Sequence, residues 1–163
     1  MSIDVLIPTK NRPEKLAMTL ACLAHQDTSR AVEVIMRDEG TVGAFESREV
    51  RQAWDMLSDR WNTVYIRDTE SIGLVRSREC LLKRSMGRSV LWLDDDILLP
   101  ASALEKLAHE LESRRAGFVI PVILDADNAR GHDDYSRKPL PEAAHRALGP
   151  SRHYVPCEVE YVD

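Results

Sequence analysis

Short apolar segments rich in β-branched residues alternate along this chain with longer segments of helical periodicity. The segments predicted as strands are 3–8, 32–37, 63–67, 89–94 and 117–123, the last weakened by Pro121, which has no N–H to donate. A helix is predicted after each of the first four strands. The first begins at Pro13, the second covers about 50–61, the third begins at about Gly73 and the fourth near Pro100. Strands that alternate with helices form βαβ units, so we expect an α/β fold, a mostly parallel sheet flanked by helices on both faces.

Three of the predicted helices carry apolar stripes. Residues three and four positions apart share one helix face, and that face is expected to pack on the core. The stripes are Leu16, Leu20, Leu23 and Ala24, then Val50, Trp54, Leu57 and Trp61, then Leu104, Leu107, Ala108 and Leu111.

Length and composition suit a single globular domain. The chain has 163 residues, of which 44% are hydrophobic and 30% charged, so a substantial core can form. We expect one domain over residues 1–163, with a loop-rich insertion at 124–154, where Asp, Arg, Pro, His and Gly accumulate. The net charge of −5 argues against non-specific nucleic-acid binding, although local basic clusters could still hold phosphates.

Cysteine usage and hydropathy predict a cytoplasmic location. The cysteines, Cys22, Cys80 and Cys157, form no CxxC pair, which favours structural thiols in a reducing compartment. The first residues, MSIDVLIPTK, lack the regions of a secretion signal. No apolar run approaches the ~20 residues that a transmembrane helix needs.

Polar clusters follow the first four predicted strands. They are TKNR, RDEG, RDTESIG and DDD, at residues 9–12, 37–40, 67–73 and 94–96. In an open α/β sheet, ligands bind at the carboxyl ends of the strands, where such loops converge. The clusters therefore predict a binding site at one edge of the sheet.

The three consecutive carboxylates are the most unusual of these clusters. Strand alternation would turn Asp94 and Asp96 the same way and Asp95 the opposite way. Two neighbouring carboxylates repel each other, and Mg²⁺ or Mn²⁺, which prefer carboxylate oxygens and often hold substrate phosphates, would relieve the repulsion. The pair could instead act as general acid and base, and one of the three is expected to cap a helix or begin a turn.

Basic residues complement the acidic ones. Lys10 and Arg12 lie in the first loop, and Arg76 and Arg78 in the third helix. Arginines beside a metal site suit a diphosphate, although a solvated helix face is their more common role. The sequence contains no GxGxxG, GxxxxGK[ST] or GxSxG motif, so dinucleotide-binding, P-loop and α/β-hydrolase fingerprints are absent.

Taken in order, VLIPTKNRPEKLAMTLACL, VEVIMRDEGT and GLVRSRECLLKRSMGRSVLWLDDDILLPASALEKLAHEL resemble the family 2 glycosyltransferases of the GT-A fold over roughly residues 3–112. The resemblance implies a nucleotide-diphosphate-sugar donor, with a UDP- or GDP-sugar expected. It also implies that the part that binds the acceptor and supplies the catalytic base would begin about where this chain ends. No catalytic base is predicted.

The resemblance further implies roles for individual residues. Pro8, Thr9, Asn11 and Arg12 would line the nucleoside pocket, Asp38 or Glu39 would bond the base, and Arg78 would approach the pyrophosphate or the base. Asp94 and Asp96 would form the DxD pair that touches the ribose and holds Mn²⁺ or Mg²⁺, with Asp95 counted among the donor-binding residues. The chain departs from the family pattern at Glu39, where a second aspartate is usual, and at Glu79, where asparagine is common.

These observations predict a metal-dependent glycosyltransferase that acts on an unidentified acceptor. The alternative is a non-catalytic nucleotide-sugar-binding domain that needs a partner chain. A nucleotidyltransferase would also use paired acids and Mg²⁺, but the loop PTKNRPEK has no glycine to form its phosphate loop.

Overall fold

The computed structural model of the chain describes residues 2–87 and 89–121. The chain divides into two compact units, residues 1–105 and residues 106–163. The predicted loop-rich segment 124–154 lies outside the described residues. No helix in the described part of the chain is long and apolar enough to cross a membrane.

A parallel four-stranded sheet of order β3-β2-β1-β4 forms the centre of the first unit. The strands are β1 (Ile3–Thr9), β2 (Val32–Asp38), β3 (Asn62–Arg67) and β4 (Ser89–Trp92). The helices are α1 (Pro13–Ala24), η1 (Ala44–Glu46), α2 (Arg48–Ser58), α3 (Leu74–Arg84) and α4 (Ala103–Ser113). The predicted α/β architecture is confirmed.

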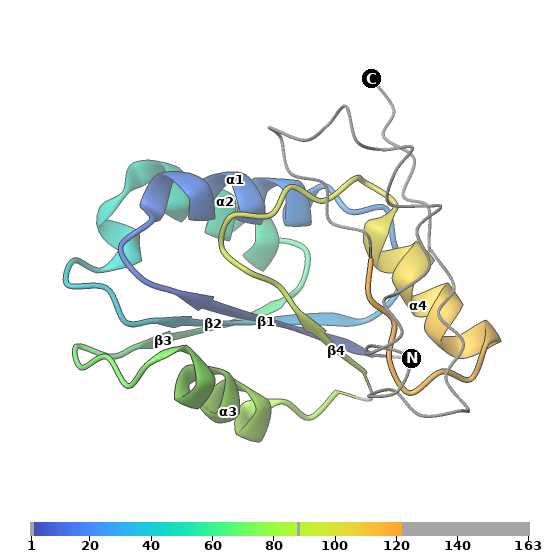
Figure 1. The fold of residues 1–163 in the computed structure, drawn as a ribbon. Coiled ribbons are helices and arrows are strands. Elements are labelled where there is room, and N and C mark those ends of the chain that lie inside the picture. Colours follow the sequence, from blue (N-terminus) through green and yellow to red (C-terminus); the bar gives the residue numbers. More distant parts are fainter. Residues whose placement is uncertain (1, 88, 122–163) are drawn as a thin grey trace, which may run out of the picture. The chain divides into compact units, whose positions relative to one another are not determined.

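Helices cover both faces of this sheet, with α1 and α2 on one face and α3 on the other (Figure 1). The alternation of side chains along β1 explains the two layers, because neighbouring residues face opposite sides. Leu6 packs with Ile35 of β2 and Leu81 of α3 in one cluster. The other face receives the apolar side of α1, whose Leu16, Leu20 and Leu23 are fully buried.

Local signals in the sequence explain where two helices begin. Pro13 occupies the first turn of α1, where a missing N–H costs nothing. The Ser47 side chain accepts a hydrogen bond from the Val50 N–H and so caps α2.

Two predicted boundaries and one predicted strand are wrong. β4 ends at Trp92, so the three aspartates follow the strand in a turn. Trp61 lies beyond the end of α2 and is half-buried, with the Arg60 guanidinium 4.7 Å from its ring centroid. Residues 117–121 form no strand, in keeping with Pro121, which cannot donate to a ladder; residues 122–123 lie outside the described part.

Candidate functional site

The strand order creates a topological switch point beside β1. The chain goes from β1 to β2 on one side and places β4 on the other, and α/β proteins bind ligands at the carboxyl ends of such strands. Leu6 is the last β1 residue paired with β4, and its carbonyl accepts a hydrogen bond from the Leu93 N–H. The backbone of Pro8, two residues further along β1, faces the same side of the strand as that of Leu6. Proline has no N–H to donate there, and β4 has already ended. The two strands therefore separate at this point.

A cavity of about 470 Å³ lies at the carboxyl ends of the strands. Its lining comes from the end of β1, the loops that follow the four strands and the first turn of α3, and it includes residues of all four predicted polar clusters. The lining residues are Pro8, Thr9, Lys10, Arg12, Glu39, Ser71, Gly73, Leu74, Ser77, Asp94, Asp95 and Asp96. We call this space the acidic cavity.

The aspartates of the acidic cavity differ in their burial. Asp95 points inward, with only 8% of its side chain exposed, and accepts a hydrogen bond of 2.7 Å from the Thr9 hydroxyl. The side chains of Asp94 and Asp96 are 54% and 33% exposed. The expectation that Asp95 points away from the other two therefore agrees with their burial, although the residues lie in a turn.

Basic side chains contact all three carboxylates. Arg78 Nη2 lies 2.6 Å from Asp94 Oδ1, and Arg12 Nη1 lies 3.0 Å from Asp96 Oδ2 and 3.3 Å from Asp95 Oδ1. Lys15 Nζ lies 3.7 Å from Asp96 Oδ2. The protein itself therefore supplies cations that relieve the repulsion, so the repulsion alone does not call for a metal ion.

Two contacts made by basic residues near the aspartates are not predicted from the sequence. Lys15 is not among the predicted site residues, although its position three residues after Arg12, in the first turn of α1, is a usable signal. Arg78 also lies over the ring of Trp92, with its guanidinium carbon 5.9 Å from the ring centroid. This contact and the ion pair hold Arg78 at the edge of the acidic cavity.

Glu39 lies at the opposite wall of the acidic cavity. Its carboxylate is buried and is bonded by Arg37 Nε at 2.9 Å, by the Ser71 hydroxyl at 3.0 Å and by the Ile72 N–H at 3.2 Å. Burial alone raises the pKa of Glu39, but these hydrogen bonds and the charge of Arg37 outweigh it, so its pKa lies below the ordinary value. Glu39 is therefore ionised and acts only as a hydrogen-bond acceptor.

Lys10 extends this network toward solvent. Its ammonium donates a hydrogen bond of 3.1 Å to the Ser71 hydroxyl, which in turn donates to Glu39. These hydrogen bonds place the Lys10 ammonium in the lining of the acidic cavity, where it contacts Ser71 and not the aspartates.

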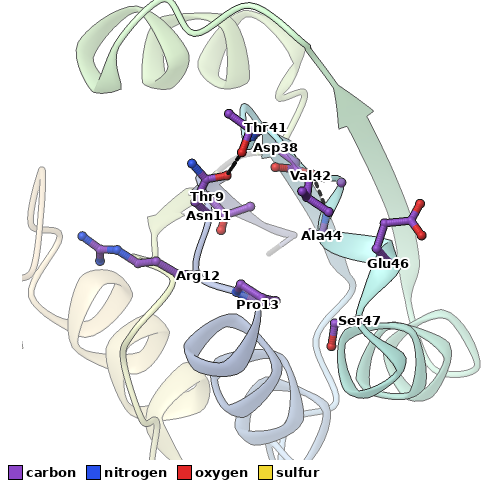
Figure 2. Close-up of a pocket in the computed structure, with 11 residues that line it drawn as sticks. Thr9, Asn11, Arg12, Pro13, Asp38, Thr41, Val42, Ala44, Glu46 and Ser47 are labelled. Atoms are coloured by element: carbon purple, nitrogen blue, oxygen red, sulfur yellow. Dashed lines mark hydrogen bonds between the residues drawn. The ribbon is translucent and has the colours of Figure 1, made fainter.

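A second, smaller cavity of about 290 Å³ lies between the loop after β1 and the loop after β2 (Figure 2). Asp38 is buried beneath it and holds the second loop, because its carboxylate accepts hydrogen bonds from the N–H groups of Gly40 and Ala44 and from the Tyr65 hydroxyl. Asn11 ties the first loop to the second by accepting from the N–H and hydroxyl of Thr41. The backbone φ of Asn11 is 56°, a left-handed conformation that asparagine tolerates.

The candidate nucleoside-binding residues are thus divided between the two cavities. Asn11 and Asp38 line the smaller one, whereas Pro8 and Glu39 line the acidic cavity. Thr9 and Arg12 belong to both linings.

The same aspartates are the candidate ligands for a divalent metal ion. Among the described residues, no group of three or more His, Cys, Asp or Glu side chains is arranged to hold a metal ion. Mg²⁺ is usually held by one or two carboxylates together with substrate phosphates, so it does not need such a protein-only cage. The exposed oxygens of Asp94 and Asp96 fit an ion that shares its coordination with a phosphate ligand.

Comparison with known proteins identifies the family. The model of "Glycosyl transferase family 2" matches residues 4–157. The N-acetylglucosaminyltransferase of Mesorhizobium japonicum is 27% identical over 117 residues, which are 71% of this chain and 27% of that protein. The putative teichuronic acid biosynthesis glycosyltransferase TuaG of Bacillus subtilis is 24% identical over 116 residues, 71% of this chain and 44% of that protein. The chain therefore spans well under two thirds of these relatives.

Solved structures share the fold. The mannosyltransferase PcManGT from Pyrobaculum calidifontis, in complex with GDP-Man and Mn²⁺, has a TM-score of 0.61 and 24% identity, covering 76% of this chain and 35% of that one. Residues 1–349 of S. aureus TarS, in complex with UDP-GlcNAc, have a TM-score of 0.58 and 24% identity, covering 75% and 37%. These likenesses show the GT-A fold. The chain belongs to glycosyl transferase family 2, as the match to residues 4–157 shows.

Proposed function

We propose that the acidic cavity binds a nucleotide-diphosphate-sugar and that the protein transfers its sugar, a hexosyl group, to an acceptor. The observation that carries the proposal is that one cavity at the switch point is lined both by cations, Lys10 and Arg12, and by exposed carboxylates, Asp94 and Asp96. A diphosphate needs the cations, and a divalent ion that neutralises it needs the carboxylates. Family membership and the donors named with the two similar structures support this reading.

The diphosphate is proposed to lie between the first loop and the start of α3. Lys10 and Arg12 would contact its oxygens, and the first N–H groups of α3, which have no partners within the helix, also suit an anion. Gly73 precedes this helix with φ of 86°, a conformation that favours glycine. It also leaves open space, because a Cβ added there would meet nothing within 4 Å.

The base is proposed to meet Glu39 rather than Asp38. Glu39 shares the acidic cavity with the aspartates and is ionised, so it can accept a hydrogen bond from a base N–H. The Asp38 carboxylate already accepts from two backbone N–H groups and the Tyr65 hydroxyl. Asp38 and Asn11 would then act indirectly, by holding the loops that form the pocket.

A divalent ion, Mn²⁺ or Mg²⁺, is proposed to be held by Asp94 and Asp96 together with the donor phosphates. Such an ion would stabilise the negative charge of the departing nucleoside diphosphate. Within the protein, Thr9 and Asp95 would keep the turn in place, and Arg78 would meet the phosphates or the base from the other side.

A thermal-shift panel of UDP-, GDP-, CMP- and dTDP-sugars, with and without Mn²⁺, tests the proposal. We expect at least one donor to raise the melting temperature, and this rise to shrink in Asp96→Ala. Asp55→Ala, at an exposed position on α2, is the matched control and should respond as the wild type does. A panel in which no donor stabilises the protein, or in which Asp96→Ala responds fully, contradicts the assignment.

A second candidate is a donor-binding part that needs another chain for chemistry. The observation that favours it is that each of the four carboxylates lining the acidic cavity already contacts a cation, so none of them stands free to act as a base. Release of free nucleoside diphosphate in the presence of a donor and candidate acceptors separates the two. Turnover supports the enzyme, whereas donor binding without transfer or hydrolysis supports the binding part.

A further inference from the structure

The acidic turn and the side chains that contact it form an electrically balanced cluster. Asp94, Asp95 and Asp96 contribute three negative charges. Three cations contact them, namely Arg78 at 2.6 Å, Arg12 at 3.0 and 3.3 Å, and Lys15 at 3.7 Å. In this arrangement a free divalent ion meets carboxylates that already have partners.

Arg12 has a special position within this cluster. A single atom, Nη1, contacts oxygens of both Asp95 and Asp96. One cation thus bridges two consecutive carboxylates, and one of these, Asp96, is a proposed metal ligand. Arg12 also lines the cavity in which the diphosphate is proposed to bind.

The backbone around Arg12 is held while its side chain is accessible. Asn11 is bonded to Thr41, and Pro13 begins α1 with its fixed φ. The Arg12 side chain is 53% exposed, and in Figure 2 it extends away from Thr41 and Val42. A long exposed side chain on a fixed backbone can change partners without a change of fold, because exposed ion pairs contribute little to stability.

We propose that Arg12 is a tethered cation that occupies the acidic turn in the nucleotide-free protein and moves to the diphosphate when donor and metal ion bind together. This inference rests on the proposed function, since it concerns how the same cavity is filled. A metal ion that arrives alone must displace the guanidinium from Asp96 and offers it no anion in return. A metal ion that arrives with a diphosphate supplies phosphate oxygens, which match the guanidinium fork.

The exchange makes metal and nucleotide binding depend on each other. The nucleoside diphosphate raises the affinity for the metal ion, and the metal ion raises the affinity for the nucleoside diphosphate by the same factor. Typical couplings of this kind lie between about fivefold and about 150-fold. Removing Arg12 abolishes the competition at Asp96, so the nucleotide-free protein then binds the metal ion more tightly and its metal affinity gains less from the nucleotide.

Titration of Mn²⁺, followed by the electron paramagnetic resonance of the free ion, tests this in the full chain. Wild type, Arg12→Gln and Arg48→Gln are compared with and without UDP or GDP. Arg48→Gln removes the same charge at an exposed position outside both cavities. We expect Arg12→Gln alone to bind Mn²⁺ at least about fivefold more tightly than wild type in the absence of nucleotide. We also expect its nucleotide-dependent gain to be smaller than that of wild type.

Equal Mn²⁺ affinities of wild type and Arg12→Gln in the absence of nucleotide would overturn the proposal. It would also be overturned if Arg48→Gln increased the Mn²⁺ affinity as much as Arg12→Gln does. Lys15→Gln provides a second variant, and its longer contact predicts a smaller change in the same direction. If neither UDP nor GDP binds to any of these proteins, the proposed function fails. The comparison without nucleotide still decides the role of Arg12.

Discussion

The hydroxyl of Thr9 donates a hydrogen bond of 2.7 Å to Asp95 Oδ2 and so joins the end of β1 to the turn after β4. Both residues are buried, and 86 positions separate them in the sequence. The contact lies where the two strands separate, and both residues belong to the lining of the acidic cavity. Because Asp95 is held inward, its neighbours Asp94 and Asp96 are left at the surface of the cavity.

Replacing Thr9 by valine tests the weight of this contact. The variant keeps the side-chain shape but leaves a buried carboxylate short of one donor, which typically costs about 1–3 kcal/mol. Urea unfolding should show a loss of this size. Thr63→Val is the control, because the Thr63 hydroxyl contacts only the exposed Ser58 hydroxyl among the described hydrogen bonds. An unchanged free energy of unfolding in Thr9→Val would mean that Arg12 alone satisfies Asp95.

Glu39→Gln tests the buried pair of Glu39 with Arg37, whose nearest atoms are 2.9 Å apart. The glutamine is neutral, so Arg37 loses part of a charge-assisted bond, and we expect a loss of about 1–3 kcal/mol at neutral pH. The folded-state pKa of Glu39 is lowered from 4.5, so its stabilising effect is present above that value and is lost as the pH falls through the folded pKa.

The pH dependence separates this charge effect from a change in packing. Urea unfolding from neutral pH to below 4.5 should show the stability gap between wild type and Glu39→Gln becoming smaller. Glu14→Gln, at an exposed position of α1, controls for the loss of one negative charge. A gap that stays constant with pH would show that the variant acts through packing alone.

Tyr65 makes the opposite kind of pH prediction. Burial, reinforced by the hydrogen bond to Asp38 and by its negative charge, raises the pKa of Tyr65 above its ordinary value of 10.0. The folded protein therefore keeps this proton where the unfolded chain has lost it, and stability falls as the pH rises above 10.0. Tyr65→Phe should be less stable than wild type at neutral pH but lose less stability between about pH 9 and about pH 11. Parallel alkaline curves for the two proteins would contradict this.

The sequence allowed the edge of the sheet that carries the candidate site to be predicted. It did not show how the candidate residues are divided between two cavities. TKNR, RDEG and DDD each follow a strand, and parallel strands bring their carboxyl ends to one edge, so Thr9, Glu39 and Asp96 were expected together and line one cavity. Adjacent residues can nevertheless face different spaces, and Asp38 and Glu39 do so. The spacing indicates Lys15 as a neighbour of Arg12, but which cation contacts which aspartate depends on how α1 and α3 pack on the sheet.

Gly40 is the residue at which a single methyl group should disturb the loop between the two cavities. A Cβ at this position would lie 2.7 Å from the Val42 carbonyl oxygen and 2.9 Å from Asn11 Oδ1, closer than real Cβ contacts allow. The loop can adapt only by weakening the bonds that Asp38 and Asn11 make to it, and overpacking of this kind typically costs about 1–3 kcal/mol.

Gly117→Ala is the matched control, because a Cβ there would meet nothing within 4 Å. Gly40→Ala should therefore lower the free energy of unfolding and the thermal shift produced by a donor nucleotide, whereas Gly117→Ala should leave both nearly unchanged. Equal behaviour of the two variants would show that the loop after β2 adapts freely and does not depend on its glycine.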